Sequence, residues 1–246
     1  MGERPFGGMT MRSWLIAALL LAAAPVLSTP VRAAGTLRFA LDFDFDTFDP
    51  ARSGSYIERV VNTAMCDQLI DIDPQLNLVP QLATSWTWSD DNLALTLTLR
   101  PGVTFSDGAP FDAEAVRANI ERYRTAPYSL RRTELKSVKG VDVLDAHTVR
   151  INLSEPFTPL LALLANRPGV MLSPRILNQP TAEISAHPVC AGPFTLADRV
   201  AQDHVTLKRF PGYWDAEHVQ LARLQVDQPD RRIRHDLEFD AVELDV

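Results

Sequence analysis

Short segments in which apolar and polar residues alternate recur along this chain and constrain its fold more than any other feature. Leucine occupies every second position from Leu93 to Leu99, and apolar residues do the same from Leu37 to Phe45. An alternation with a period of two residues is typical of a β-strand with one buried face. The predicted strands are residues 35–46, 93–99, 138–143, 148–153, 193–197, 204–210 and 221–226.

Between these strands, apolar residues take the spacing of helices. Residues 56–70 show this spacing after Ser55, a favourable N-cap, and Asp112 caps a second helix that runs to about Arg124. Within the second helix, Arg117 and Glu121 are predicted to form an i,i+4 ion pair. Thr158 is the predicted N-cap of a third, largely buried helix that ends near residue 165. The chain is therefore expected to be mixed α and β, with more strand than helix.

The N-terminus has the layout of a secretory signal peptide. Arg12 precedes the apolar run Trp14–Leu27, and small or turn-forming residues follow up to Ala33. The run of about 14 residues is shorter than the roughly 20 that a membrane-spanning helix requires. We therefore expect export and cleavage near Ala33, the alternative being an uncleaved membrane anchor.

Charge and the motif inventory exclude several classes of function. The net charge of −7 repels phosphate backbones and argues against a nucleic-acid partner. The sequence contains no G-x-S-x-G, G-x-G-x-x-G or P-loop motif, and its five histidines form no ligand pair on a helix. We therefore predict no catalytic residue, no metal site and no cofactor, although a spatial pair of carboxylates stays open because the sequence does not reveal one.

The two cysteines, Cys66 and Cys190, both lie in the part predicted to be exported. An oxidising compartment allows them to pair, and a bridge across so long a loop would stabilise the fold. The alternative is a pair of buried free thiols.

Residues Asn77–Tyr123 carry an ordered series of short motifs. A P-x-L-A-x-S-W entry precedes an S-D-D turn, then L-R-P-G-V-x-F-S-D-G-x-P-F, then a helix that begins D-A-E-A-V. In this order, the series resembles the signature stretch of the family 5 extracellular solute-binding proteins, the peptide and nickel binders of ABC importers. The blocks "DTFDPARS" (46–53), "VCAGPFTL" (189–196) and "LKRFPGYWD" (207–215) are also similar to blocks of that family.

The resemblance implies a mixed α/β (α+β) fold of the class II periplasmic binding protein type, with two lobes that close on a ligand. It implies that residues 34–70 and 178–246 form a discontinuous first lobe, after a signal peptide at 1–33, and that residues 71–177 form an inserted subdomain. Both cysteines would then belong to the first lobe, which favours the disulfide. Family members are much longer, so we expect a truncated copy in which the second lobe is missing.

The resemblance also implies a function: a monomeric periplasmic binding protein that delivers a peptide or related small solute to an ABC permease. The alternatives are a non-binding remnant, a nickel or haem-type solute binder, or, with less support, a secreted hydrolase. Aromatic and acidic residues near the first strand and before the second are the candidate ligand contacts, although Trp86 and Trp88 would equally suit the core. The candidates are Phe43, Asp44, Phe45, Tyr56, Trp86 and Trp88.

Overall fold

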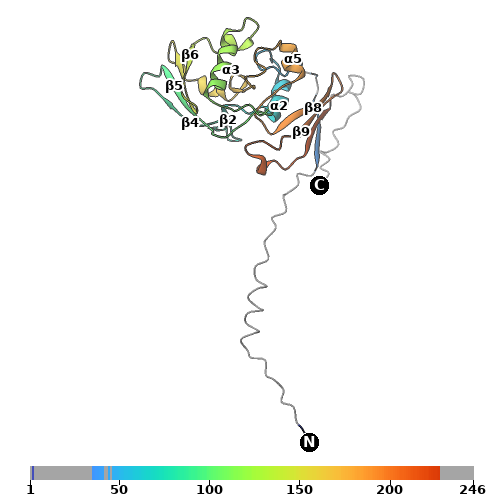
Figure 1. The fold of residues 1–246 in the computed structure, drawn as a ribbon. Coiled ribbons are helices and arrows are strands. Elements are labelled where there is room, and N and C mark those ends of the chain that lie inside the picture. The colour runs from blue at the N-terminus through green and yellow to red at the C-terminus, as the bar shows by residue number, and fades with distance from the viewer. Residues whose placement is uncertain (1, 3–34, 42–43, 45, 228–246) are drawn as a thin grey trace. The chain divides into compact units, whose positions relative to one another are not determined.

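Two four-stranded sheets organise the chain in a computed structural model, which describes residues 2, 35–41, 44 and 46–227 (Figure 1). Phe43, Phe45, the predicted signal peptide apart from Gly2, and residues 228–246 lie outside the described residues. The strands are β1 (Thr36–Ala40), β2 (Ile70–Ile72), β3 (Leu78–Pro80), β4 (Ala83–Trp88), β5 (Ala94–Leu99), β6 (Val138–Asp145), β7 (Thr148–Leu153), β8 (Phe194–Val200), β9 (His204–Arg209) and β10 (Arg223–Asp227).

Helices and single 3-10 turns connect these strands. The α-helices are α2 (Tyr56–Met65), α3 (Ala113–Thr125), α4 (Leu160–Leu164) and α5 (Thr181–Ala186). The 3-10 turns are η1 (Leu130–Arg132), η2 (Arg167–Gly169) and η3 (Ala216–His218). No helix within the described ranges combines the length and the apolar character that a membrane crossing requires.

The first sheet has the order β1-β10-β9-β8 and joins strands from the two ends of the described chain. β1 pairs in parallel with β10, with Phe39 opposite Val226, while β9 runs antiparallel to both β10 and β8. β1, β8 and β10 therefore point in the same direction, and their carboxyl ends lie at the same edge of the sheet.

The second sheet has the order β4-β5-β7-β6 and is antiparallel throughout. Its inner face contributes Leu95, Leu97 and Leu99 to the core, as their alternation predicts, and α3 packs against β6 and β7. Figure 1 places this sheet and the sheet that contains β8 and β9 on opposite sides of the described residues, with α2 and α3 between them.

Each sheet has its own hydrophobic core. The cluster on the second sheet includes Phe105, Phe111 and Tyr123, and the cluster on the first sheet includes Phe48, Val205 and Leu207. Buried and more exposed residues alternate along β5, β7 and β9, so each sheet has one apolar face, and covering that face with helices is the expected solution. The mixed α/β composition predicted from the sequence is confirmed.

Two elements are shorter in the structure than predicted from the sequence. The first strand ends at Ala40, where its partner β10 ends at Asp227, so residues 41, 44 and 46 are not part of it. α2 begins after Ser55, which forms the predicted cap together with a capping box from Glu58, but the helix ends at Met65 instead of residue 70. The helix does not continue to residue 70 because Ile70–Ile72 forms β2, which pairs with β3.

Two local predictions are wrong in detail. Arg117 pairs with Glu114, and Glu121 pairs with Arg124, so the predicted Arg117–Glu121 pair does not form. α4 begins without a side-chain cap, because its N-cap residue is Pro159 and not Thr158.

Candidate functional site

The loop between β1 and α2 lies at the edge where β1, β8 and β10 end. Asp44 in this loop has a carboxylate oxygen 3.6 Å from the guanidinium of Arg199, and its other oxygen accepts a hydrogen bond of 2.9 Å from the backbone N–H of Gln202. Ligands of α/β sheets gather outside the carboxyl ends of strands. The loop therefore lies where a binding site is expected.

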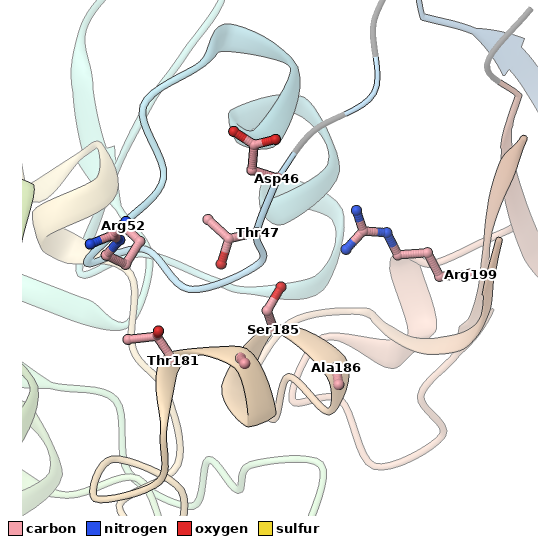
Figure 2. A pocket seen from close by; sticks show the side chains of 8 residues that line it. Asp46, Thr47, Arg52, Thr181, Ser185, Ala186 and Arg199 are labelled. Carbon is pink, nitrogen blue, oxygen red and sulfur yellow. The ribbon is translucent and has the colours of Figure 1, made fainter. Parts of the chain in front are cut away.

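A polar hollow of about 440 Å³ opens between this loop and α5 (Figure 2). Ser185 of α5 ties the two walls together, since its hydroxyl accepts a hydrogen bond of 3.1 Å from the backbone N–H of Phe48. Charged and hydroxyl-bearing residues make up most of its lining, so the hollow suits a polar and not an apolar occupant. The lining residues are Asp46, Thr47, Arg52, Thr181, Ala182, Ser185, Ala186 and Arg199.

Beyond the hollow, the loop makes a tight turn at Asp49–Ser53, in which Ser53 is buried, and then presents Gly54, Ser55 and Tyr56 to solvent. The backbone carbonyl of Asp49 accepts hydrogen bonds from the N–H groups of Arg52 and Ser53, each 2.9 Å long. Asp49 itself is fully buried. The turn is thus held from inside the protein, while Tyr56 at its end is 73% exposed.

Two arginines from distant parts of the chain hold the exposed end of the loop. Arg131 donates a hydrogen bond of 3.1 Å to the Ser53 carbonyl, and Arg167 donates one of 3.0 Å to the Ser53 hydroxyl and another to the Ser55 carbonyl. Burial lowers the pKa of Arg131, and the charge of Arg167 lowers it further, while Glu134, 2.7 Å away, acts in the opposite direction. The two guanidinium groups therefore lie close enough to repel each other.

Arg167 differs from Arg131 in its charge balance. No carboxylate in the described part of the chain forms an ion pair with half-buried Arg167, whereas Arg131 is neutralised by Glu134. The local backbone fixes Arg167 at the start of η2, because a Cβ on Gly169 would lie 1.7 Å from the Leu164 carbonyl oxygen. Such a guanidinium is suited to bind a carboxylate.

An apolar surface adjoins this charge. Leu130 is 51% exposed, and its Cδ1 lies 3.7 Å from the position of a Cβ built on Gly54. Together with Tyr56, it offers apolar contact beside the cation. We name the set Ser53–Tyr56, Leu130, Arg131 and Arg167 the cationic turn. Its chemistry fits a small organic anion that has both a carboxylate and an apolar part.

The predicted contacts are distributed over two places. Asp44 and Tyr56 both belong to the loop between β1 and α2. Trp86 and Trp88 lie on β4, half-buried, and pack against the core cluster of the second sheet. Their contribution to ligand binding stays a prediction, as do those of Asp44 and Tyr56. The sequence did not indicate Arg131 and Arg167 as site residues. Their hydrogen-bond partners in the loop lie 78 residues away for Arg131 and more than 110 residues away for Arg167.

Both cysteines belong to the hydrophobic cluster of the first sheet. Cys66 and Cys190 form a disulfide with their Cα atoms 4.9 Å apart, across 124 residues. Gly192 allows the segment before β8 to lie close to the end of α2, because a Cβ on Gly192 would lie 2.3 Å from the Met65 carbonyl oxygen. The bridge thereby joins the end of α2 to the segment that leads into β8.

A buried carboxylate follows the first cysteine. Asp67 is 2% exposed and accepts hydrogen bonds from Trp214 Nε1 at 2.7 Å and from Gln81 Nε2 at 3.2 Å. Desolvation raises the pKa of Asp67 to about 7, although the hydrogen bonds from Trp214 and Tyr213 act to lower it. The guanidinium of Arg100 stacks over the ring of Trp214, 3.9 Å from the ring centroid. This network joins four segments of the chain, and nothing in the local sequence pattern indicated it.

One surface group contains metal-ligand side chains. Asp215, Glu217 and His218 bring their ligand atoms within 4.8 Å of one another near η3. Asp215 raises the pKa of His218, which favours a hydrogen-bonded imidazolium there. Exposed acidic groups of this kind commonly hold no ion, so the group adds no metal hypothesis.

The fold identifies the class of protein to which this chain belongs. It superposes on the structure of the PBP AgaA in complex with agropinic acid from A. tumefaciens R10, with a TM-score of 0.76 and 27% identity over 82% of this chain and 41% of that one. NikA from Brucella suis, in complex with Fe(III)-EDTA, gives a TM-score of 0.71 and 29% identity over 81% and 40% of the two chains. The class is that of the periplasmic binding proteins, as predicted.

The sequence places the chain within that class. Residues 77–234 match the family described as bacterial extracellular solute-binding proteins, family 5 Middle. The glutathione-binding protein GsiB of Salmonella paratyphi A is 37% identical over 202 residues, which cover 82% of this chain and 39% of GsiB. The chain belongs to the family 5 extracellular solute-binding proteins, and it spans about two fifths of the length of the relatives that it matches.

Proposed function

We propose that this chain belongs to the periplasmic substrate-binding component of an ABC importer, and that its solute is a peptide or a related small molecule with a free carboxylate. Membership of family 5 supports the transport role. The solutes named for its relatives support the chemistry: glutathione, agropinic acid and Fe(III)-EDTA are all carboxylic acids or carboxylate complexes.

One observation supports a particular residue, Arg167, as the group that binds the carboxylate. Arg167 presents a guanidinium group with no carboxylate partner in the described ranges, beside exposed Tyr56 and Leu130. A bidentate arginine–carboxylate pair would anchor the end of a peptide, and the apolar side chains would contact the rest. The polar hollow lies on the same loop and has room for further polar groups of the solute.

Export, domain organisation and partners form part of the same proposal. The signal-like N-terminus supports cleavage near Ala33 and a periplasmic location. The two sheets with separate cores support residues 34–70 and 178–246 as a first lobe with an inserted subdomain at 71–177. An ABC permease is the proposed partner, and we expect the protein to act as a monomer that binds its solute without catalysing a reaction.

A thermal unfolding experiment on the purified chain tests this function. A ligand that binds only the folded state, added at about 100 times its Kd, stabilises the protein by about 2.7 kcal/mol and raises the midpoint. We expect glutathione, or a pool of di- to oligopeptides, to raise it, and glutathione diethyl ester to raise it less because its carboxylates are blocked. A cooperative transition that no carboxylate solute moves at millimolar concentration would contradict the proposal.

A further inference from the structure

The buried ion pair between Asp49 and Arg122 adjoins the cationic turn, because the Asp49 carbonyl accepts a hydrogen bond from the Ser53 N–H. Arg122 Nη1 and Nη2 donate to the two carboxylate oxygens of Asp49 at 2.9 and 2.6 Å. Both side chains are nearly inaccessible, 6% exposed for Arg122 and fully buried for Asp49. A two-pronged pair of this kind fixes orientation as well as distance.

Asp49 in turn fixes the backbone of the loop through hydrogen bonds. Its Oδ1 also accepts a hydrogen bond of 3.0 Å from the Ala51 N–H, and its carbonyl accepts from Arg52 and Ser53. The next residues are those that Arg131 and Arg167 contact. The path from α3 to Arg167 is therefore an unbroken series of hydrogen bonds through Arg122, Asp49 and Ser53.

The same helix offers a contrast. Asn119, fully buried one turn before Arg122, exchanges hydrogen bonds of 2.8 and 3.1 Å with the backbone of Leu172. It stabilises the packing of α3 as Arg122 does, but its partner is not part of the loop. A general loss of stability and a specific loss of loop geometry can thus be separated.

We propose that Arg122 is a positioning residue for the solute site: it orients Asp49, and through Asp49 the turn that carries Ser53–Tyr56 toward Arg167. This proposal rests on the proposed function for the identity of the site. Arg122 itself does not touch the solute in this proposal, because its side chain is buried and its guanidinium is paired with Asp49. Arginine is required at this position because lysine cannot donate to both carboxylate oxygens in one plane.

Two measurements on the full chain test the proposal, with glutathione as the probe. We expect Arg122→Gln to raise the Kd about tenfold, and Asn119→Ala to change it by less than about twofold, even if both variants unfold at lower temperature. Hydrogen exchange at the Ala51, Arg52 and Ser53 amides should accelerate in Arg122→Gln and not in Asn119→Ala. Arg122→Lys, which leaves no unpaired buried carboxylate, should give an intermediate Kd and replaces Arg122→Gln if the latter does not fold.

The outcomes separate this proposal from the function on which it rests. If the folded wild type does not bind glutathione, the proposed function loses support for this solute, and the exchange rates at the three amides decide the positioning claim by themselves. Wild-type affinity together with wild-type exchange rates in Arg122→Gln, or in Arg122→Lys if that variant is the one that folds, would overturn it. Equal losses of affinity in Asn119→Ala would overturn it as well, because they would show a general effect of stability.

Discussion

Single residues carry most of the chemistry that distinguishes this protein, and they are buried or half-buried. Asp49, Asp67 and Arg122 are all ionisable groups within the protein interior. Burial of a charge is costly unless hydrogen bonds and opposite charges compensate it. Asp49 and Arg122 compensate each other, whereas Asp67 has only neutral donors and the more distant Arg100.

Asp67 should make the stability fall as the pH rises. Its pKa is raised from 3.8 in the unfolded chain to about 7 in the fold, so the folded state binds the proton more tightly. The stabilisation is present below about pH 4 and is lost as the pH rises through 7. Between pH 4 and 8, we expect the wild type to lose roughly 2–4 kcal/mol relative to Asp67→Asn.

Urea unfolding of both proteins at several pH values measures this difference. Asp73→Asn is the control of opposite sign, because hydrogen bonds from Asn77 lower the pKa of this exposed carboxyl, so its contribution is lost as the pH falls. Parallel pH profiles for the wild type and Asp67→Asn would refute the role of Asp67.

At the scale of elements, signals carried by neighbouring residues were predictive, whereas features that depend on pairing with distant segments were not. Ser55 and Asp112 cap the helices they were expected to cap, because N-caps depend on neighbouring residues. The end of α2 was not predictable, because it depends on the pairing of β2 with β3 and on a partner of Cys66 that lies 124 residues away. The roles of Asp67 and Arg167 were not predictable for the same reason, since their hydrogen-bond partners are distant in sequence.

The disulfide joins two such elements, α2 and the entry to β8. In the chain-entropy description, closing a loop of this length stabilises the fold, so we expect Cys66→Ser/Cys190→Ser to lose about 2–4 kcal/mol. Urea unfolding with and without a reductant measures the loss. The reductant should lower the midpoint of the wild type to that of the double variant and leave the double variant unchanged. Equal midpoints for the oxidised wild type and the double variant would contradict a stabilising bridge.

At the scale of the whole molecule, the described residues form two sheets whose cores meet near the disulfide and the Asp67 network. The order of motifs along the chain predicted both the mixed α/β fold and the family, because those motifs span residues far apart. The site was less predictable. Two of its expected residues, Phe43 and Phe45, lie outside the described residues, and the cationic turn is formed by contacts between segments that no local pattern connects.

The central claim is that the cationic turn binds a carboxylate through Arg167. Calorimetric titration of glutathione into the wild type, Arg167→Gln and Arg117→Gln tests it most directly. Arg117→Gln is the matched control, because it removes an exposed arginine that pairs with Glu114 away from the cationic turn. A charge-assisted hydrogen bond contributes about 1.5–3 kcal/mol, so we predict that Arg167→Gln weakens binding by about 10- to 100-fold while Arg117→Gln stays within about twofold. Equal affinities for the wild type and Arg167→Gln, with both proteins folded, would contradict the claim.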